Sequence, residues 1–69
     1  MRVEINGEPR ELAEGASAHD AALALGIEPG RGVAIALDGK VVHRGELDRT
    51  PLREGQRVEV VQAIGGGAR

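Results

Sequence analysis

The 69-residue sequence contains no cysteine, phenylalanine, tryptophan or tyrosine. Without cysteine the chain has no disulfide, no thiolate metal ligand and no thiol nucleophile, so any sulfur chemistry must use sulfur supplied from outside. Without aromatic side chains it lacks the stacking platforms on which single-stranded nucleic acids bind. Nine basic and eleven acidic residues give a net charge of -2, the wrong sign for binding a phosphate backbone. We therefore expect no nucleic-acid partner.

Long apolar segments are absent as well. No apolar run approaches the roughly 20 residues that a membrane-spanning helix needs. The first residues, Met-Arg-Val-Glu-Ile, alternate in polarity and do not resemble a signal peptide. We expect a single small cytoplasmic domain with no membrane association. Because a chain of this size buries only about 60% of its unfolded surface, its stability should be modest.

Alternation of apolar and polar residues predicts strands at five places. These are residues 2–5, 8–12, 33–37, 40–42 and 57–63. Asn6-Gly7 is the strongest short hairpin signal, since both residues accept a positive φ. Asp38-Gly39 closes a second hairpin. Pro9 cannot donate to a strand ladder, so residues 8–12 should form an edge strand.

One short helix is predicted between the second and third strands. Ser17 lies three residues before Asp20, as in a capping box, and Gly26 is well placed to end the helix. One apolar stripe faces the core, consisting of Ala18, Ala21, Ala22 and Leu25. This helix needs a sheet beneath it to be stable, because it has only two to three turns.

The order of these elements suits an α+β fold, in which one helix packs across one face of a mixed sheet of four to five strands. We expect the last strand to run parallel to the first and to lie between it and residues 33–37. The polar residues 43–51 should form a loop that Leu47 and Leu52 pin to the core. Among a few α+β arrangements, a β-grasp, or ubiquitin-like, domain over residues 1–64 is the first choice.

The sequence ends in Gly65-Gly66-Gly67-Ala68-Arg69. Each glycine loses much backbone entropy on ordering, so residues 65–69 are predicted to be a flexible tail. Many chain ends of this kind have no function. This one directly follows an apolar central strand, and glycine has no Cβ. Such a tail could therefore enter a narrow channel and present its end inside the active site of another protein.

Strand parity predicts a small apolar patch beside the root of this tail. Arg57, Glu59, Val61 and Ala63 should lie on the sheet face opposite the helix, next to Ala34 and Ala36. We predict that a partner docks there. The predicted docking residues are Val61, Ala63, Ile64, Ala34 and Ala36. The alternative is that they are ordinary exposed strand residues.

No catalytic or metal site is predicted. His19 and His43 do not form a metal-ligand pair, and solvated side chains are expected for both. Gly30-Arg31-Gly32 lacks the context of a dinucleotide loop and reads as a turn. The acidic residues are scattered over turns and strand edges. We expect no bound cofactor, no bound metal and no enzymatic activity of the chain itself.

Three segments resemble the thiamine-pathway sulfur carriers, small ubiquitin-like proteins that end in Gly-Gly. They are Val3-Glu4-Ile5-Asn6-Gly7-Glu8, Arg31-Gly32-Val33-Ala34-Ile35-Ala36-Leu37, and the stretch from Pro51 to Gly67. The last third is the most specific. The resemblance covers residues 1–67, and it carries over Gly67 as the acyl residue and Gly66 as the second member of the diglycine.

The resemblance also implies partners. An adenylyltransferase related to ubiquitin-activating enzymes would use ATP and magnesium to adenylate the terminal glycine. Sulfur from a cysteine-derived persulfide, supplied by a cysteine desulfurase or a rhodanese-type protein, would then displace AMP and leave a thiocarboxylate. Thiazole synthase would take that sulfur. Carriers for molybdopterin, cysteine or tRNA thiolation share these features, and a passive β-grasp binding module is the alternative from another class.

The sequence departs from this pattern at its end. Ala68 and Arg69 follow the glycines, so the Gly67 carbonyl as written lies in a peptide bond. Either a peptidase removes the two residues, or they are an addition to the natural chain, or the protein is not activated. We favour a precursor that a peptidase trims.

Overall fold

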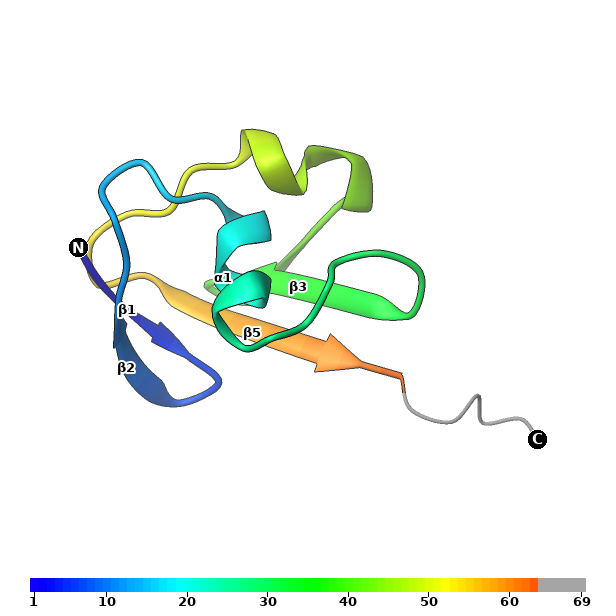
Figure 1. Ribbon diagram of the computed structural model, residues 1–69, viewed down its shortest axis with the longest axis horizontal. Helices are drawn as coiled ribbons and strands as arrows, with labels where there is room; N and C mark the ends of the chain where they lie inside the picture. The colour runs from blue at the N-terminus through cyan, green and yellow to red at the C-terminus, as the bar shows by residue number, and fades with distance from the viewer. Residues whose placement is uncertain (64–69) are drawn as a thin grey trace.

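The computed structural model describes residues 1–63. Within them five strands form one mixed sheet in the order β2-β1-β5-β3-β4, and α1 lies across one of its faces (Figure 1). The elements are β1 (Arg2–Ile5), β2 (Glu8–Glu11), α1 (Ala18–Ala24), β3 (Val33–Leu37), β4 (Lys40–Val42), the 3₁₀ helix η1 (Arg44–Arg49) and β5 (Arg57–Gln62). The predicted α+β, β-grasp fold is confirmed. The boundary expected at residues 64 and 65 lies outside the described residues.

The last strand occupies the predicted central position. β5 pairs parallel with β1 on one side and antiparallel with β3 on the other. The other two pairings, β1 with β2 and β3 with β4, are antiparallel hairpins. The two edges of the sheet are therefore β2 and β4, and Pro9 lies on an edge strand, as predicted.

Both hairpins turn through residues in the left-handed region. The φ angles are 52° and 85° at Asn6 and Gly7, and 49° and 87° at Asp38 and Gly39. This pair of positive φ values is the pattern of a type I′ turn, whose twist matches that of the flanking strands. The turn chemistry in the sequence thus sets the register of both hairpins.

Helix α1 has the predicted cap at each end. The Ser17 side chain accepts a hydrogen bond from the Asp20 amide, and the Asp20 side chain accepts one from the Ser17 amide. At the other end Gly26 has a φ of 77°, and the Ile27 and Gly26 amides donate to the carbonyls of Ala22 and Leu23. These two bonds define a Schellman motif. Local sequence signals therefore fix both ends of a helix of only 7 residues.

The core lies between the sheet and the helix, and most of its volume comes from the sheet. The buried side chains of the strands are Val3, Ile5, Ile35, Leu37, Val58 and Val60. The helix contributes only alanines to the fully buried set, at positions 18, 21 and 22. Leu47 and Leu52 supply the remaining large buried side chains, as predicted. The segment after β4 therefore completes a core that the helix cannot fill.

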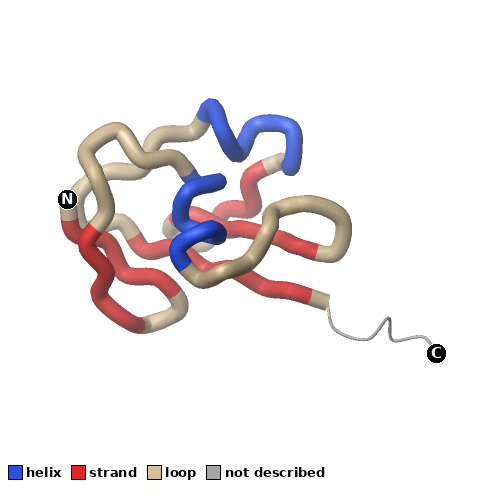
Figure 2. Tube along the Cα trace, in the orientation of Figure 1, coloured by secondary structure: helices blue, strands red, loops and turns tan. Residues whose placement is uncertain are grey.

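The prediction that residues 43–51 form a loop is wrong for most of that segment. Residues 44–49 form η1, which lies beyond one end of α1 (Figure 2). His43 caps η1, because its Nδ1 accepts a hydrogen bond from the Gly45 amide at 3.0 Å. A 3₁₀ turn needs no amphipathic period of its own, so the polar sequence gave no helical signal.

Leu47 connects η1 to the core, with 3% of its surface exposed. We expect Leu47→Ala to lower the free energy of unfolding by about 2 to 5 kcal/mol, because it removes a buried side chain and leaves a cavity. Urea denaturation of the two proteins measures this difference. Val41→Ala is the control, since Val41 is 75% exposed and its truncation should have little effect. Equal losses in the two variants would contradict this role for η1.

Candidate functional site

The candidate site is the open face of the sheet at the end of β5. Val58 and Val60 point into the core, whereas Arg57, Glu59 and Val61 are exposed on the opposite face. The Ala63 amide donates to the Gly32 carbonyl at 2.7 Å, which extends the β3–β5 pairing to the last described residue. One residue, Ile64, separates Ala63 from the three glycines in the sequence.

The structure brings four of the five predicted docking residues together. Ala34 lies directly opposite Val61 in the β3–β5 register, and Ala36 lies opposite Glu59. Val61 is 62% exposed, and Ala34 and Ala63 are exposed as well. Ile64, the fifth predicted docking residue, lies outside the described residues. The β3–β5 register thus places Ala34, Ala36 and Val61 on one face of the sheet, and the docking role of the predicted residues stays a prediction.

The structure adds Val41 to this patch. Val41 is directly opposite Ala36 in the β3–β4 hairpin, and it is the most exposed large apolar residue described, at 75%. Sequence reasoning missed it, although the parity of the Asp38-Gly39 hairpin places it on the same face as Ala36. We call Ala34, Ala36, Val41, Val61 and Ala63 the apolar patch. Together they extend the patch across β4, β3 and β5.

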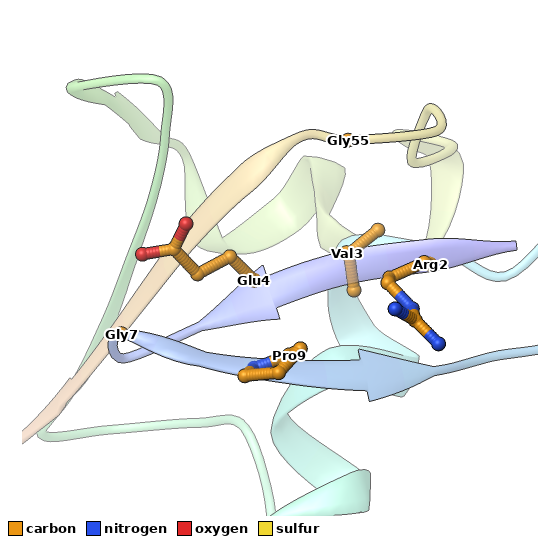
Figure 3. A pocket seen from close by; sticks show the side chains of 6 residues that line it. All are labelled: Arg2, Val3, Glu4, Gly7, Pro9 and Gly55. Carbon is orange, nitrogen blue, oxygen red and sulfur yellow. The ribbon is translucent and has the colours of Figure 1, made fainter.

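The other half of the open face is charged. Glu4 on β1 lies beside Arg57 on β5, and the Arg2 Nε is 3.5 Å from Glu11 Oε1 on β2. A shallow hollow opens here, lined by Arg2, Val3, Glu4, Gly7, Pro9 and Gly55, and in Figure 3 Arg2 points toward β2 and Glu4 toward β5. A partner that covers the whole face would thus meet an apolar half and a half of mixed charge.

Asp38 anchors the β3–β4 hairpin to the start of β5. Its Oδ1 accepts a hydrogen bond from the Arg57 amide at 3.2 Å, and its Oδ2 accepts one from Gln56 Nε2 at 3.1 Å. Gln56, which is 9% exposed, also accepts from the Arg53 amide. The Arg57 amide and the Gln56 side chain lower the pKa of Asp38, with a smaller effect from the Arg53 and Arg57 charges. Sequence analysis treated Asp38 only as a turn residue.

The remaining candidate residues do not form a site in the structure. His43 caps η1, His19 lies on α1, and Gly32 turns with a φ of 84°. In residues 1–63 no three side chains of the metal-ligating types gather into a group. The same part of the chain has no helix long and apolar enough to cross a membrane. The residues of the predicted acylation site, Gly66 and Gly67, lie outside the described residues, as do Gly65, Ala68 and Arg69.

The five-stranded sheet, the single α-helix across it and the central last strand define a β-grasp, or ubiquitin-like, protein. Within that class, the chain belongs to the ThiS family, whose sequence model matches residues 3–67. Two solved structures of a thiamine biosynthesis protein (ThiS) from Geobacter metallireducens are similar to it. The crystal structure has a TM-score of 0.77 at 30% identity and covers 97% of this chain and 100% of that one. The solution structure has the same score and identity, and covers 100% of this chain and 91% of that one.

Two curated relatives differ in length. The sulfur carrier protein ThiS of Thermus thermophilus is 40% identical over 63 residues, which make up 91% of this chain and 95% of the relative. A thiazole synthase of Magnetococcus marinus is 36% identical over 67 residues, which make up 97% of this chain. Our chain spans only 20% of that thiazole synthase. A segment similar to nearly all of this chain is thus part of a much longer protein.

The hydrogen bonds of Asp38 predict how stability depends on pH. Folding lowers the pKa of this carboxyl group. Its ionised form therefore stabilises the fold above the unfolded-state pKa of about 4, and that contribution disappears as the pH falls through the lower folded-state value. Urea unfolding at a series of acidic pH values should show a steeper loss of stability for the wild type than for Asp38→Asn. If the free energy of unfolding fell equally with pH in both proteins, the stabilising role of ionised Asp38 would be contradicted.

Proposed function

We propose that this chain is a sulfur carrier for thiamine thiazole synthesis and acts as a cosubstrate, not as an enzyme. The observation that carries the proposal is the position of β5 in a ThiS-family fold. This strand is held at the centre of the sheet, presents Val61 on the open face and leads into Gly65-Gly66-Gly67. The names of the Thermus and Geobacter relatives, a sulfur carrier and a thiamine biosynthesis protein, support it.

The proposed chemistry takes place on the carboxyl group of Gly67. A carboxylate is a poor electrophile, so a partner adenylyltransferase with ATP and magnesium would first convert it to an acyl adenylate and release pyrophosphate. The terminal sulfur of a persulfide, provided by a cysteine desulfurase or a rhodanese-type protein, would then displace AMP and form an acyl disulfide. A cysteine thiolate of the donor or of the activating enzyme would cleave the S–S bond, so that a protein disulfide forms and the thiocarboxylate is released. Glycine suits this role, because without a Cβ its acyl carbon is unhindered. No residue of the chain needs to act as an acid, a base or a nucleophile.

This chemistry requires that Ala68 and Arg69 be removed. With both residues present, the Gly67 carbonyl belongs to an amide, and there is no carboxylate to adenylate. We therefore propose that a peptidase releases the active form.

Thiazole synthase is the proposed acceptor of the sulfur. In the Magnetococcus protein named thiazole synthase, a segment similar to 97% of this chain belongs to the same polypeptide. Joining two proteins in one polypeptide raises the effective concentration of one at the other. That arrangement favours partners that act in successive steps, and it supports transfer of sulfur from this chain to a thiazole synthase.

The chemical proposal is tested with the chain ending at Gly67. Incubated with ATP, magnesium, sulfide and a candidate activating enzyme, this form should gain the mass of one oxygen-to-sulfur exchange. The 69-residue chain should gain nothing under the same conditions, because its Gly67 carbonyl is not a carboxylate. Intact-mass measurement of the protein from its native host gives the second test. Persistence of Ala68 and Arg69 in the functional form would exclude Gly67 as the acyl residue.

The docking proposal is tested at Val61. Val61→Glu should weaken binding to the activating enzyme by about tenfold or more, because it places a charge in the middle of an apolar contact. Leu23→Glu is the matched control: it introduces the same charge at an apolar residue that is 44% exposed on α1, on the other side of the sheet. Titration calorimetry or surface plasmon resonance measures both affinities. Equal affinities of Val61→Glu and Leu23→Glu for the activating enzyme would contradict docking at the apolar patch.

A further inference from the structure

The side chain of Asn6 binds both backbone groups of Val60. Its Oδ1 accepts a hydrogen bond from the Val60 amide at 2.8 Å, and its Nδ2 donates to the Val60 carbonyl at 3.1 Å. Only this orientation of the carboxamide satisfies a donor and an acceptor on the same residue. Asn6 thus does more than provide a positive φ for the hairpin.

The carboxamide replaces a peptide group that β1 no longer offers. The β1–β5 ladder runs from the Glu4 amide, which donates to the Gln56 carbonyl at 3.0 Å, to the Asn6 amide, which donates to the Val58 carbonyl at 2.9 Å. In a continued parallel ladder the next carbonyl and amide of β1 would bind Val60. The turn at Asn6 and Gly7 takes the backbone away at this point. The Asn6 side chain has the same planar C=O and N–H groups and makes both bonds.

Val60 depends on Asn6 because of the direction of its backbone. Alternate residues of a strand direct their hydrogen-bonding groups to opposite neighbours. Arg57 and Ala63 bond toward β3, through the Asp38 amide and the Gly32 carbonyl. Gln56 and Val58 bond toward β1. The groups of Val60 therefore also face β1, where the part of the chain that the structure describes supplies Asn6 alone.

This contact is the last point at which β5 is held from both sides. Beyond Val60 the described pairings of β5 are all with the β3 side, at Ala34–Val61, at Val33–Gln62 and at the Ala63 amide. We propose that Asn6 is a positioning residue, which fixes the end of β5, the strand that precedes the glycines, in the position that the activating enzyme accepts. This inference rests on the proposed function, because it assigns Asn6 a part in the same reaction.

Two substitutions separate this role from that of a turn residue. Glycine and aspartate both suit the first position of a type I′ turn. Asn6→Gly removes both bonds to Val60, whereas Asn6→Asp keeps an acceptor for the Val60 amide and loses the donor for its carbonyl. If Asn6 served only the turn, both variants would have the amide exchange rate at Val60 and the kcat of the wild type. A positioning role predicts that the Val60 amide exchanges most slowly in the wild type, faster in Asn6→Asp and fastest in Asn6→Gly, and that kcat falls in the same order.

The first measurement is native-state amide hydrogen exchange on the full chain. In Asn6→Gly the Val60 amide should exchange roughly tenfold to a hundredfold faster, as expected for two lost hydrogen bonds. The Glu4 amide, which bonds to Gln56 in the same ladder, is the internal reference and should change much less. Ile5→Val is the control for general destabilisation. It trims a core side chain next to Asn6 without changing the atoms that bind Val60, so its effect should be similar at both amides.

The second measurement follows thiocarboxylate formation by the chain ending at Gly67. A misplaced end of β5 should lower kcat by roughly tenfold to a hundredfold in Asn6→Gly. KM for the carrier should change less, because three of the five residues of the apolar patch, Ala34, Ala36 and Val41, lie on β3 and β4. Ile5→Val should keep the wild-type kcat.

Three results would overturn the proposal. Unchanged amide exchange at Val60 in Asn6→Gly would show that the Asn6 side chain does not hold the end of β5. An equal fall of kcat in Ile5→Val would show that stability alone matters. Absence of product from the wild type would end both the proposed function and the role of Asn6 in it. In that case the exchange data would still show whether Asn6 holds Val60. Failure of the proposed function and failure of the Asn6 contact are therefore distinguishable.

Discussion

The central pairing of β5 is the constraint on which the rest of the structure depends. This strand ends the described domain, yet it lies between β1 and β3, and Val58 and Val60 from it are buried in the core. Residue 4 must meet residue 57 before the sheet is complete, and a contact of such long sequence separation is costly to form. The sheet therefore closes only when the segment that leads to the glycines is in place. Folding of the domain therefore requires the pairing of β5, the strand that precedes the glycines in the sequence.

The lack of aromatic residues determines how the remaining core is built. A helix that buries only Ala18, Ala21 and Ala22 can approach a sheet closely, but it fills little volume. The chain compensates with the segment after β4, where η1 buries Leu47 and the following residues bury Leu52. Backbone bonds tie this segment to the start of α1: the Ala18 amide donates to Thr50, and the Leu52 amide donates to Ala16. Helix α1 and the segment that contains η1 therefore pack together against the same face of the sheet.

The sequence predicted those features that depend on local chemistry. Asn6-Gly7 and Asp38-Gly39 specify their hairpins, Ser17 and Gly26 specify the ends of α1, and the two-residue period of β3 and β5 specifies which side chains share a face. The features it missed depend on distant contacts. The carboxamide of Asn6 acts 54 residues away, at Val60, and Asp38 acts on residues 56 and 57. In both cases a turn residue explained by its φ angle has a second role, which only the folded sheet reveals.

These second roles show how one strand serves two purposes. The side chains of β5 alternate between the core and the open face, and its backbone groups alternate between β1 and β3. Changes at Val61 or Glu59 can therefore alter the open face while Val58 and Val60 maintain the core. Asn6 binds only the backbone of β5, and Asp38 binds the Arg57 amide together with the side chain of Gln56, the residue before β5. Both leave the alternating side chains of β5 free. This separation lets the residues of the open face vary without loss of the fold.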